Sequence, residues 1–450
     1  MLEQEIQNKI SDFRESGLPD YIPREGKIHQ AKNTVSTIIG ARRAGKSYRA
    51  LQFADELLKE GVIKSLRQVC PIDFDNPILS EMKAGEIKNI AGVFLKMNPE
   101  FELNTPLVFI FDEIHKIKGW ELAVIDLSKK SNWKIIVTGS SSKLLRDDIA
   151  TELRGKSISS IVYPLNFREF LKFKRFEGDE ASTKSQAEIK RHFDAYLKWG
   201  GYPAMADTED ASKPALLREY FDTMILRDIL QRYDVSKPNV CTHLCRFLLS
   251  NIARPATIQS VYDYIKESGF TTSRDAVRDY IHWARDSWLL FLVDIFSKSH
   301  KEQERNYKKV YCVDWGLACF NSPIWDGSFS RAFENMIFLQ LIRSHARLHF
   351  YLTKTKRQEV DFVALGRNGR PELAVQVCMD ISRKETLKRE LEPLITTAKY
   401  FGIKENLLIT LNHEEKFHED GVTVNSVPAW KWLVQNSGEM SPHFDPVLGL

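Results

Sequence analysis

The sequence is poor in cysteine and has no long hydrophobic run. It holds 6 cysteines in 450 residues, and so few scattered cysteines in a long chain do not favour a disulfide scaffold. A membrane-spanning helix needs about 20 consecutive apolar residues, and no stretch of the sequence comes near that length. Residues 1–17 are polar and lack the hydrophobic region of a signal peptide. These absences predict a cytoplasmic protein without a membrane partner.

The sequence also lacks a large excess of charge of either sign. Its 64 Lys and Arg residues nearly balance 60 Asp and Glu residues, which leaves a net charge of +4. Such a mild charge neither requires nor excludes nucleic acid, so a DNA-binding surface would have to be a local basic patch. A chain of 450 residues is too long for one core, and two or three domains are therefore expected.

The most informative motif is Gly40–Ser47, whose sequence GARRAGKS fits the P-loop pattern G-x-x-x-x-G-K-[ST]. Apolar residues 35–39 before it predict a buried strand, and residues 47–59 after it have helical spacing. Phosphates would then lie at a helix N-terminus, where Lys46 reaches the β- and γ-phosphates and Ser47 holds Mg²⁺. A chance glycine-rich turn is the alternative, and the strand and helix on either side argue against it. The residues predicted to bind ATP or ADP are Gly40, Ala41, Arg42, Arg43, Ala44, Gly45, Lys46, Ser47 and Tyr48.

A second motif ends in two acidic residues. Residues 107–113 read LVFIFDE, and five consecutive apolar residues favour a strand that is covered on both faces. Asp112 would help to hold Mg²⁺, and Glu113 would act as a general base towards water. Alternatively, both carboxylates only cap a helix that begins near Ile114, an interpretation that the upstream P-loop disfavours.

A third apolar strand, residues 134–137, is followed by residues with hydroxyl groups. Thr138 or Ser140 would contact the γ-phosphate or the attacking water, and we assign this catalytic sensor role to Thr138. The alternative is an ordinary turn with a serine that caps a helix at residues 143–146.

Strands and helical stretches alternate through residues 31–165. This alternation predicts a mostly parallel sheet with helices on both faces, and such a sheet binds ligands at the carboxyl ends of its strands. The P-loop, Asp112 and Thr138 all fall at such ends. The predicted strands are 35–39, 68–73, 107–111, 134–137 and 158–162.

Changes in pattern divide the chain into six parts. Residues 166–234 have the size and position of a helical lid, and beyond residue 300 short apolar strands alternate with two helices. The predicted parts are a lead-in (1–30), a P-loop ATPase core (31–165), a helical lid (166–234), a winged-helix-like domain (235–300), a mixed α/β domain (301–410) and a C-terminal tail (411–450).

Residues 238–300 resemble a winged helix-turn-helix, with two short helices, a glycine turn, a third helix at 274–283 and a strand at 289–295. Polar side chains on the third helix would contact DNA. Alternatively, the unit serves only in protein packing. The candidate DNA-binding residues are Thr272, Ser273, Arg274 and Arg278.

Cys241, His243 and Cys245 have a spacing that suggests a metal site. No second ligand pair lies nearby in the sequence, so a buried helix face is the favoured interpretation and no metal is predicted there.

Together these motifs resemble prokaryotic AAA-type P-loop ATPases that carry a C-terminal domain of unknown function. The resemblance spans about residues 35–410 and implies an α/β fold: an AAA+-like P-loop sheet with a helical lid, a winged-helix-like domain and a C-terminal mixed α/β domain. The segments that carry it are Gly40–Ser47, Leu107–Glu113, Thr138–Ser140, Leu153–Gly155, Pro164–Phe170, Gly200–Pro203, Val313–Leu317, Phe333–Asn335 and Glu359–Phe362.

The resemblance also implies an oligomer. ATPases of this type work as rings, such as hexamers, or as other homo-oligomers, and an arginine of one subunit completes the neighbour's site. Arg154 is the best candidate for that catalytic arginine, which would stabilise charge on the γ-phosphate. A salt-bridge arginine in a turn is the alternative.

The C-terminal domain is similar to the PD-(D/E)XK nuclease fold, in which acidic residues and a lysine surround a metal. The matching acidic positions are Glu334 and Asp361. Gln376 stands where an acid is usual and Cys378 where the lysine belongs, so we expect a degenerate fold retained for binding or assembly. Lys384 or Lys388 are the lysines that could replace the missing one in space.

The sequence therefore favours an oligomeric ATPase that binds and hydrolyses Mg-ATP and acts on DNA as a motor or remodeller. A nucleotide-dependent signalling switch without DNA is one alternative. An ATP-regulated nuclease is another.

Overall fold

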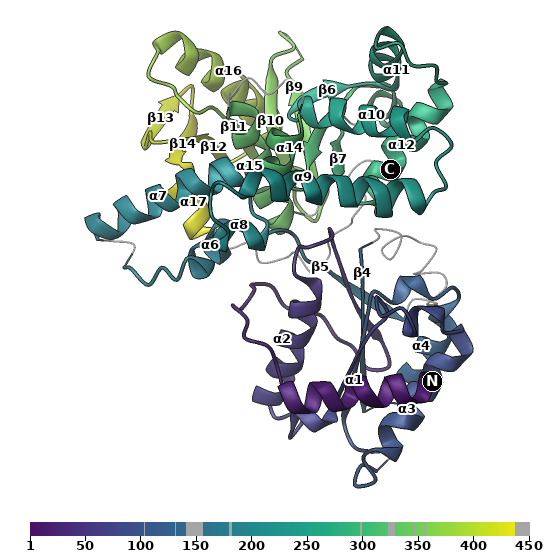
Figure 1. Cartoon of the computed structure of the whole chain (residues 1–450). Coiled ribbons are helices and arrows are strands. Elements are labelled where there is room, and N and C mark those ends of the chain that lie inside the picture. The colour runs from purple at the N-terminus through teal and green to yellow at the C-terminus, as the bar shows by residue number, and fades with distance from the viewer. Residues whose placement is uncertain are drawn as a thin grey trace. The chain divides into compact units, whose positions relative to one another are not determined.

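The computed structural model describes residues 1–102, 104–130, 132–140, 156–179, 182–297, 299–322, 329–345, 347–354 and 356–436. The chain forms two compact units, Met1–Tyr163 and Pro164–Leu450. Figure 1 traces both units, each of which has its own sheets and helices. None of the described helices is long and apolar enough to cross a membrane.

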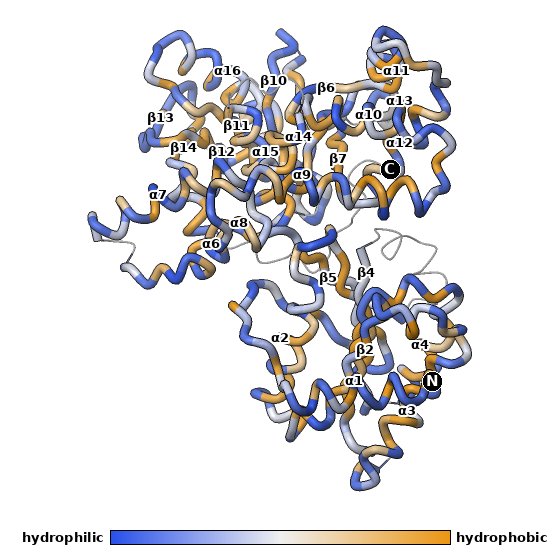
Figure 2. The backbone as a smooth tube through the Cα atoms, in the orientation of Figure 1, coloured by the Kyte–Doolittle hydropathy of each residue, from blue (hydrophilic) through white to orange (hydrophobic). Residues whose placement is uncertain are grey.

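Unit 1 is built on a five-stranded parallel sheet with the strand order β2-β3-β4-β1-β5. This confirms the predicted parallel α/β sheet. Every residue of β1 is buried, as are the first five residues of β3. Figure 2 shows hydrophobic segments around the label β2 of the same sheet. The strands are β1 (Val35–Ile39), β2 (Val69–Asp73), β3 (Leu107–Asp112), β4 (Trp133–Gly139) and β5 (Ser157–Ile161).

Helices cover both faces of this sheet. Figure 1 shows α2 on one side of the strands and α3 and α4 on the other, the arrangement that right-handed crossovers between parallel strands produce. The helices of unit 1 are α1 (Leu2–Ser16), α2 (Lys46–Lys59), α3 (Ile87–Lys96) and α4 (Trp120–Ser128), with short 3₁₀ turns η1 (Leu66–Gln68), η2 (Leu79–Glu81), η3 (Ala84–Glu86) and η4 (Ile114–Lys116).

Unit 2 contains a six-stranded mixed sheet with the order β13-β14-β12-β11-β10-β9. Helix α16 (Lys384–Phe401) packs on it through Leu391, Leu394, Ile395 and Ala398, whose spacing places them on one face of the helix. The strands are β9 (Leu348–Leu352), β10 (Glu359–Leu365), β11 (Pro371–Val377), β12 (Glu405–Thr410), β13 (Glu415–Glu419) and β14 (Val422–Pro428).

Two boundaries of unit 2 differ from the expectation. The expected tail includes β13, β14 and the helix α17 (Ala429–Gln435), and β14 pairs in parallel with β12, so this part of the chain completes the sheet. Strand β8 (Lys308–Cys312) pairs with β6 (Arg254–Ala256) and β7 (Leu290–Val293) rather than with the larger sheet. A division at residue 300 therefore separates strands that share hydrogen bonds.

Helices form the remainder of unit 2. Ser273 caps α12 by accepting a hydrogen bond from the Ala276 N–H at 3.1 Å. Cys241 and Cys245 are both fully buried on α10, which confirms the buried helix face. The helices are α6 (Phe167–Phe173), α7 (Thr183–Trp199), α8 (Pro203–Asp207), α9 (Lys213–Thr223), the π-helical η6 (Met224–Gln231), α10 (Pro238–Ser250), α11 (Ile258–Glu267), α12 (Arg274–Asp286), α13 (His300–Arg305), α14 (Trp315–Asn321), α15 (Ser330–Ser344), α16 (Lys384–Phe401) and α17 (Ala429–Gln435).

Two of the sequence motifs meet at a buried carboxylate in unit 2. Asp314 caps α14 through the Leu317 N–H at 3.0 Å and accepts the Gly201 N–H at 2.7 Å. A Cβ at Gly200 would lie 2.2 Å from a carboxylate oxygen of Asp314, so only glycine fits there. Burial raises the pKa of Asp314 to about 7 despite these hydrogen bonds. These motifs thus have a structural role.

Candidate functional site

The P-loop backbone forms a cradle that only glycine permits at two positions. Gly40 has φ 146°, and a Cβ there would lie 2.1 Å from the Val162 carbonyl oxygen. Gly45 has φ 98° and caps the N-terminus of α2, which begins at Lys46. The helix N-terminus therefore presents free N–H groups and a positive dipole end at the mouth of this loop.

Lys46 is buried at the floor of the loop. Its Nζ donates to the Ala41 carbonyl at 3.1 Å and lies 3.7 Å from Glu113 Oε1. A separation of 3.7 Å leaves the charges attracted to each other without a tight hydrogen bond. The ammonium therefore keeps capacity for a further anionic partner.

Asp112, at the end of β3, joins the P-loop helix to β4. Its carboxylate accepts hydrogen bonds from the hydroxyls of Ser47 and Thr138. Burial raises the pKa of Asp112, and both hydrogen bonds oppose that rise. A carboxylate and a serine hydroxyl side by side offer the oxygen ligands that Mg²⁺ prefers.

Glu113 follows Asp112 in a left-handed conformation, with φ 50°. Its N–H donates to Thr138 Oγ1 at 3.0 Å, so the same threonine orients both acidic residues. Burial opposes ionisation of Glu113, but the charges of Lys46, His115 and Arg42 outweigh it and hold its pKa below the ordinary value. Glu113 is therefore ionised at neutral pH. A strained backbone at such a position is typical of functional sites.

Beyond Thr138, the described part of β4 leads to a buried hydroxyl. Ser140 is 1% exposed, and its Oγ has no hydrogen-bond partner in the described structure. A buried polar atom without a partner is costly, so this hydroxyl is available to a ligand. Arg154, the candidate catalytic arginine, lies outside the described residues, as do residues 143–146.

The remaining P-loop positions differ in exposure. Ala41 and Ala44 are buried in the loop, whereas Tyr48, on the first turn of α2, is 52% exposed. Arg43 has φ 65°, and Arg42 is close enough to act on the Glu113 carboxylate. The loop itself is thus the buried part of the predicted nucleotide-binding set.

Arg24 supports the P-loop through hydrogen bonds that the sequence motifs do not predict. Its guanidinium donates to the carbonyls of Ala44 and Tyr163, both at 2.7 Å. The side chain of Gln52, on α2, accepts a hydrogen bond from the Arg24 backbone N–H at 2.9 Å and donates one to the Arg24 carbonyl at 3.0 Å. The segment before β1 is therefore fastened to the P-loop helix. An arginine in a lead-in segment gives no motif signal of its own.

These residues fit a magnesium nucleotide. The glycine cradle, the loosely held Lys46 and the Ser140 hydroxyl, which no described residue engages, leave donors for phosphate oxygens. Ser47 and Asp112 form the oxygen pair suited to Mg²⁺.

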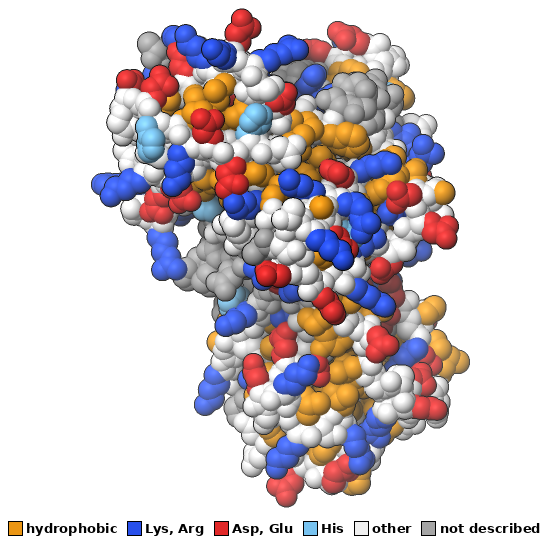
Figure 3. Space-filling model, turned by 90° about the vertical axis from the view of Figure 1, so that its left-hand side faces the viewer, with side chains coloured by type: hydrophobic (Ala, Val, Ile, Leu, Met, Phe, Trp, Pro, Cys, Tyr) orange, Lys and Arg blue, Asp and Glu red, His pale blue; other side chains and the backbone are white. Residues whose placement is uncertain are grey.

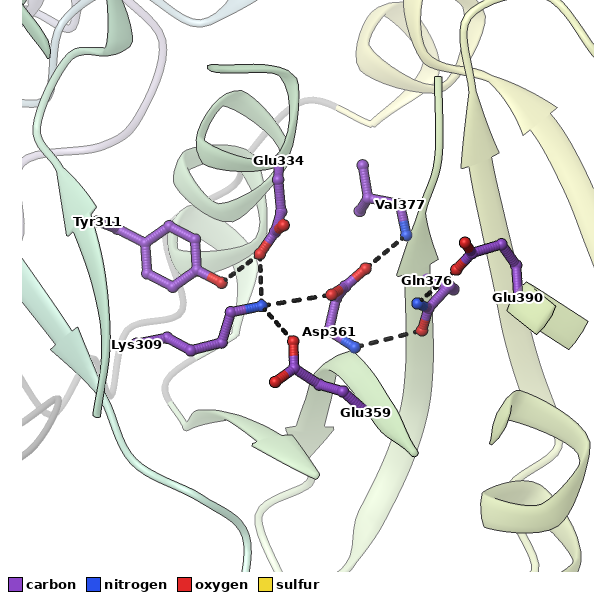
Figure 4. A network of polar contacts seen from close by, with 8 residues as sticks. All are labelled: Lys309, Tyr311, Glu334, Glu359, Asp361, Gln376, Val377 and Glu390. Carbon is purple, nitrogen blue, oxygen red and sulfur yellow. Dashed lines mark hydrogen bonds and ion pairs between the residues drawn. The ribbon is translucent and has the colours of Figure 1, made fainter. Parts of the chain in front are cut away.

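A second polar cluster lies in unit 2, around the predicted nuclease-like positions (Figure 4). Glu334 of α15 and Asp361 of β10 do converge, but both contact the ammonium of Lys309, at 2.6 and 3.3 Å. The same ammonium contacts Glu359 at 2.9 Å. Lys309 belongs to β8, far in the sequence from Cys378, which occupies the lysine position of the nuclease-like fold. A lysine that alternates with Tyr311 on an apolar strand is the signal that could have revealed it.

Gln376 lies beside this cluster (Figure 4). Its side-chain oxygen accepts the Asp361 N–H at 3.3 Å, and its side-chain nitrogen donates to Glu390 at 2.8 Å. Cys378 donates to the Asp380 carbonyl at 3.3 Å, and burial raises the pKa of its thiol.

Lys384 and Lys388 do not replace the missing lysine. Both line a surface hollow on α16 together with Glu419 and Asp420, whereas the lysine that reaches the acids is Lys309.

The four candidate DNA-binding residues lie at the start of α12. Arg278 pairs with Asp275 at 2.7 Å, and the Arg274 guanidinium lies 5.4 Å from the centre of the Tyr262 ring. Ser273 is engaged in capping, and the Thr272 hydroxyl is buried. On the face drawn in Figure 3, Lys and Arg side chains lie among Asp and Glu rather than in one basic field.

The fold and site of unit 1 define an AAA-type, P-loop ATPase-like domain, and comparison with known proteins agrees. The family model described as "AAA domain" matches residues 32–171. A second model, "Domain of unknown function (DUF8612)", matches residues 190–324. This second match lies in the middle of the chain, whereas the resemblance had placed such a domain at the C-terminal end.

The chain is similar over most of its length to proteins of an archaeon and a bacterium. It is 31% identical to the uncharacterised protein MJ1544 of Methanocaldococcus jannaschii over 422 residues, which cover 91% of this chain and 90% of that protein. It is 25% identical to an uncharacterised protein of Haemophilus influenzae over 417 residues, with 91% and 98% covered. The chain therefore belongs to the same family of AAA-domain proteins as MJ1544.

Among solved structures, the Walker-type ATPase PABY2304 of Pyrococcus abyssi is similar with a TM-score of 0.41 and 14% identity. The match covers 70% of this chain and 95% of that one.

Proposed function

We propose that the chain binds Mg-ATP at the P-loop and hydrolyses it. The observation that carries the proposal is the convergence of Lys46, Ser47, Asp112, Glu113 and Thr138 on one edge of the sheet. The P-loop N–H groups and Lys46 bind the phosphates, and Ser47 with Asp112 would hold Mg²⁺. When bound, Mg²⁺ neutralises charge on the phosphate oxygens.

In this proposal Glu113 is the general base. It is ionised at neutral pH, because the positive charges of Lys46, His115 and Arg42 keep its pKa low, and an ionised carboxylate can accept a proton from water. Thr138 fixes its backbone through the hydrogen bond to its N–H. The Ser140 hydroxyl, which has no partner among the described residues, is a further donor for the γ-phosphate or the attacking water, so the sensor role is shared between these two positions.

Nucleotide binding by the full chain tests this proposal. Lys46→Ala removes the cation that faces the phosphates, and we expect ATP affinity to fall at least about tenfold. Lys59→Ala is the matched control, because Lys59 lies at the other end of α2 and is 73% exposed. Equal ATP affinity in wild type and Lys46→Ala would contradict ATP binding at the P-loop.

We further propose a homo-oligomer, such as a hexameric ring, that acts on DNA in the cytoplasm. The support is the family's AAA domain together with the helix–strand–helix–helix–strand order of α10–β7. The short helix α13 separates this run from a further strand, β8, and apart from α13 the order is that of a winged helix. An arginine of one subunit, with Arg154 as the candidate, would stabilise γ-phosphate charge in its neighbour.

ATP hydrolysis with single-stranded, duplex and branched DNA at low salt tests this second step. Stimulation that is lost in the Arg274→Ala/Arg278→Ala double variant supports DNA action, with Lys399→Ala as a control on a distant helix. Flat hydrolysis with every DNA would favour the signalling switch. The ion pair between Arg278 and Asp275 favours the signalling switch, because it reduces the positive charge available to DNA phosphates.

A further inference from the structure

Three carboxylates in unit 2 converge on one point, and a lysine ammonium occupies it. The three belong to Glu334, Glu359 and Asp361, and we call them the acidic cage. Their oxygens lie 2.6, 2.9 and 3.3 Å from Lys309 Nζ. Figure 4 shows the three side chains pointing at the ammonium from different directions. Convergence of several carboxylate oxygens on one point is the arrangement by which proteins bind small divalent cations.

The Lys309 ammonium stays charged and remains bound to the three carboxylates of the acidic cage. Lys309 is 1% exposed, whereas Glu334 and Asp361 are 15% and 9% exposed. Burial would favour loss of the Lys309 proton, but the carboxylates outweigh burial and keep the pKa of Lys309 well above its ordinary value. An ammonium has three donors, and the three carboxylates take all of them. Lys309 therefore has no donor left for an external ligand.

Neighbouring groups reinforce this arrangement from both sides. Tyr311, two residues along β8, donates its hydroxyl to the same Glu334 oxygen at 2.7 Å. Asp361 accepts the Val377 N–H on its second oxygen at 2.9 Å. Asn335, next to Glu334 on α15, bonds both the N–H and the carbonyl of Cys312 at 2.7 and 2.9 Å. The cage thus joins β8 of the three-stranded sheet to α15 and to β10 of the six-stranded sheet.

We propose that Lys309 is the built-in cation of the acidic cage: the wild-type chain binds no divalent metal there, and removal of the lysine side chain creates a site for one. The three carboxylates carry one negative charge each when ionised, so the vacated cage would be strongly attractive to a small dication. The cage is then a joint between two sheets rather than a metal-dependent nuclease centre. This proposal does not depend on ATP binding by unit 1.

Mn²⁺ binding to the nucleotide-free full chain tests the proposal. The variants are Lys309→Ala, the double variant Lys309→Ala/Asp361→Asn, and Asp361→Asn alone. Lys308→Ala is the matched control, because Lys308 is the adjacent residue on β8 and pairs instead with Asp294 at 2.5 Å. We expect Lys309→Ala to bind one more Mn²⁺ per chain than wild type, and the double variant to lose that ion.

Three outcomes would overturn the proposal. The first is Mn²⁺ binding by wild type that Asp361→Asn abolishes, because the ammonium would then share the cage with a metal. The second is a folded Lys309→Ala variant that gains no Mn²⁺. If Lys309→Ala is unfolded without metal, recovery of its near-ultraviolet circular dichroism on addition of Mn²⁺ supports the proposal, and failure to recover is the third contrary result.

Discussion

Lys46 and Lys309 are both buried lysines that face carboxylates, yet their surroundings differ. Lys46 lies 3.7 Å from the Glu113 carboxylate and donates to a backbone carbonyl at 3.1 Å. Lys309 contacts three carboxylates at 2.6 to 3.3 Å. The first lysine can accept an anionic ligand, whereas the second is saturated by the protein itself. Burial of a lysine therefore does not by itself identify a ligand-binding site. What identifies one is an ammonium donor that the protein leaves without an acceptor.

The largest expected effect is on catalysis in unit 1. Glu113→Gln removes the proton acceptor while keeping the shape of the side chain, so we expect ATP hydrolysis to fall at least about 100-fold with ATP affinity nearly unchanged. Steady-state phosphate release and nucleotide titration measure the two quantities. Glu100→Gln is the control, because Glu100 is an exposed carboxylate paired with Arg67. Wild-type turnover in Glu113→Gln would exclude Glu113 as the base.

The next effect separates the two lysines by stability. Lys309→Met leaves the acidic cage without its cation, and breaking a buried ion pair costs about 3–5 kcal/mol of the free energy of unfolding. Lys46→Met removes one charge contact at 3.7 Å and one hydrogen bond to the Ala41 carbonyl, so we expect a smaller cost of about 1–2 kcal/mol. Urea unfolding of both variants measures the difference. Equal losses would mean that the two lysines are held alike.

The two regions should also respond to pH with opposite sign. Burial, aided by the charge of Asp361, raises the pKa of Glu334 to about 7 although Lys309 opposes the rise. The folded chain then holds a proton that the unfolded chain loses above about pH 4.5, so this group's contribution to stability falls as pH rises from about 4.5 to 7, by on the order of 3 kcal/mol. The pKa of Glu113 is lowered, so its contribution is present above its unfolded pKa and is lost as pH falls through its folded pKa.

Urea unfolding at several pH values checks these signs. Glu334→Gln should remove the loss of stability between about pH 4.5 and 7, and Glu113→Gln should leave that loss in place. If Glu334→Gln shows the same profile as wild type, the Glu334 carboxyl does not titrate in this range.

The smallest expected effect concerns the support of the P-loop by Arg24. Arg24→Ala removes both hydrogen bonds to carbonyls and loosens the loop, so we expect ATP affinity to fall about five- to tenfold, or about 1 kcal/mol. Tyr21→Phe is the control, since it removes only the nearby hydrogen bond to Asp55. A fall of the same size in both variants would assign the effect to the whole segment rather than to Arg24.

Local signals in the sequence predicted much of the fold. Strand β1 has the predicted bounds, and β2 and β3 differ from theirs by one residue at one end, because an apolar run is a local property of the sequence. The P-loop and Asp112 fall at the strand ends where the sequence placed them. The pairing of β8 with β6 and β7, and the addition of β14 to the large sheet, depend on contacts between distant segments. Such pairings have no local signal.

The two sites differ in the same way. The residues of the P-loop site lie in three short motifs, so spacing alone was enough to propose them. The acidic cage draws its lysine from β8 and its acids from α15 and β10, with 25 to 52 residues between partners. Glu359 belongs to the motif Glu359–Phe362, but its role becomes evident only from its contact with Lys309. Arg24 is likewise recognised only from its contacts.

The most direct test of the contrast between the two lysines is a count of Mn²⁺ ions bound by the full-length Glu113→Gln chain in the presence of ATP. We predict one ion per chain that requires nucleotide, is lost on Lys46→Ala, and is unchanged by Asp361→Asn. Absence of any nucleotide-dependent ion, or a second ion that Asp361→Asn removes, would contradict the account.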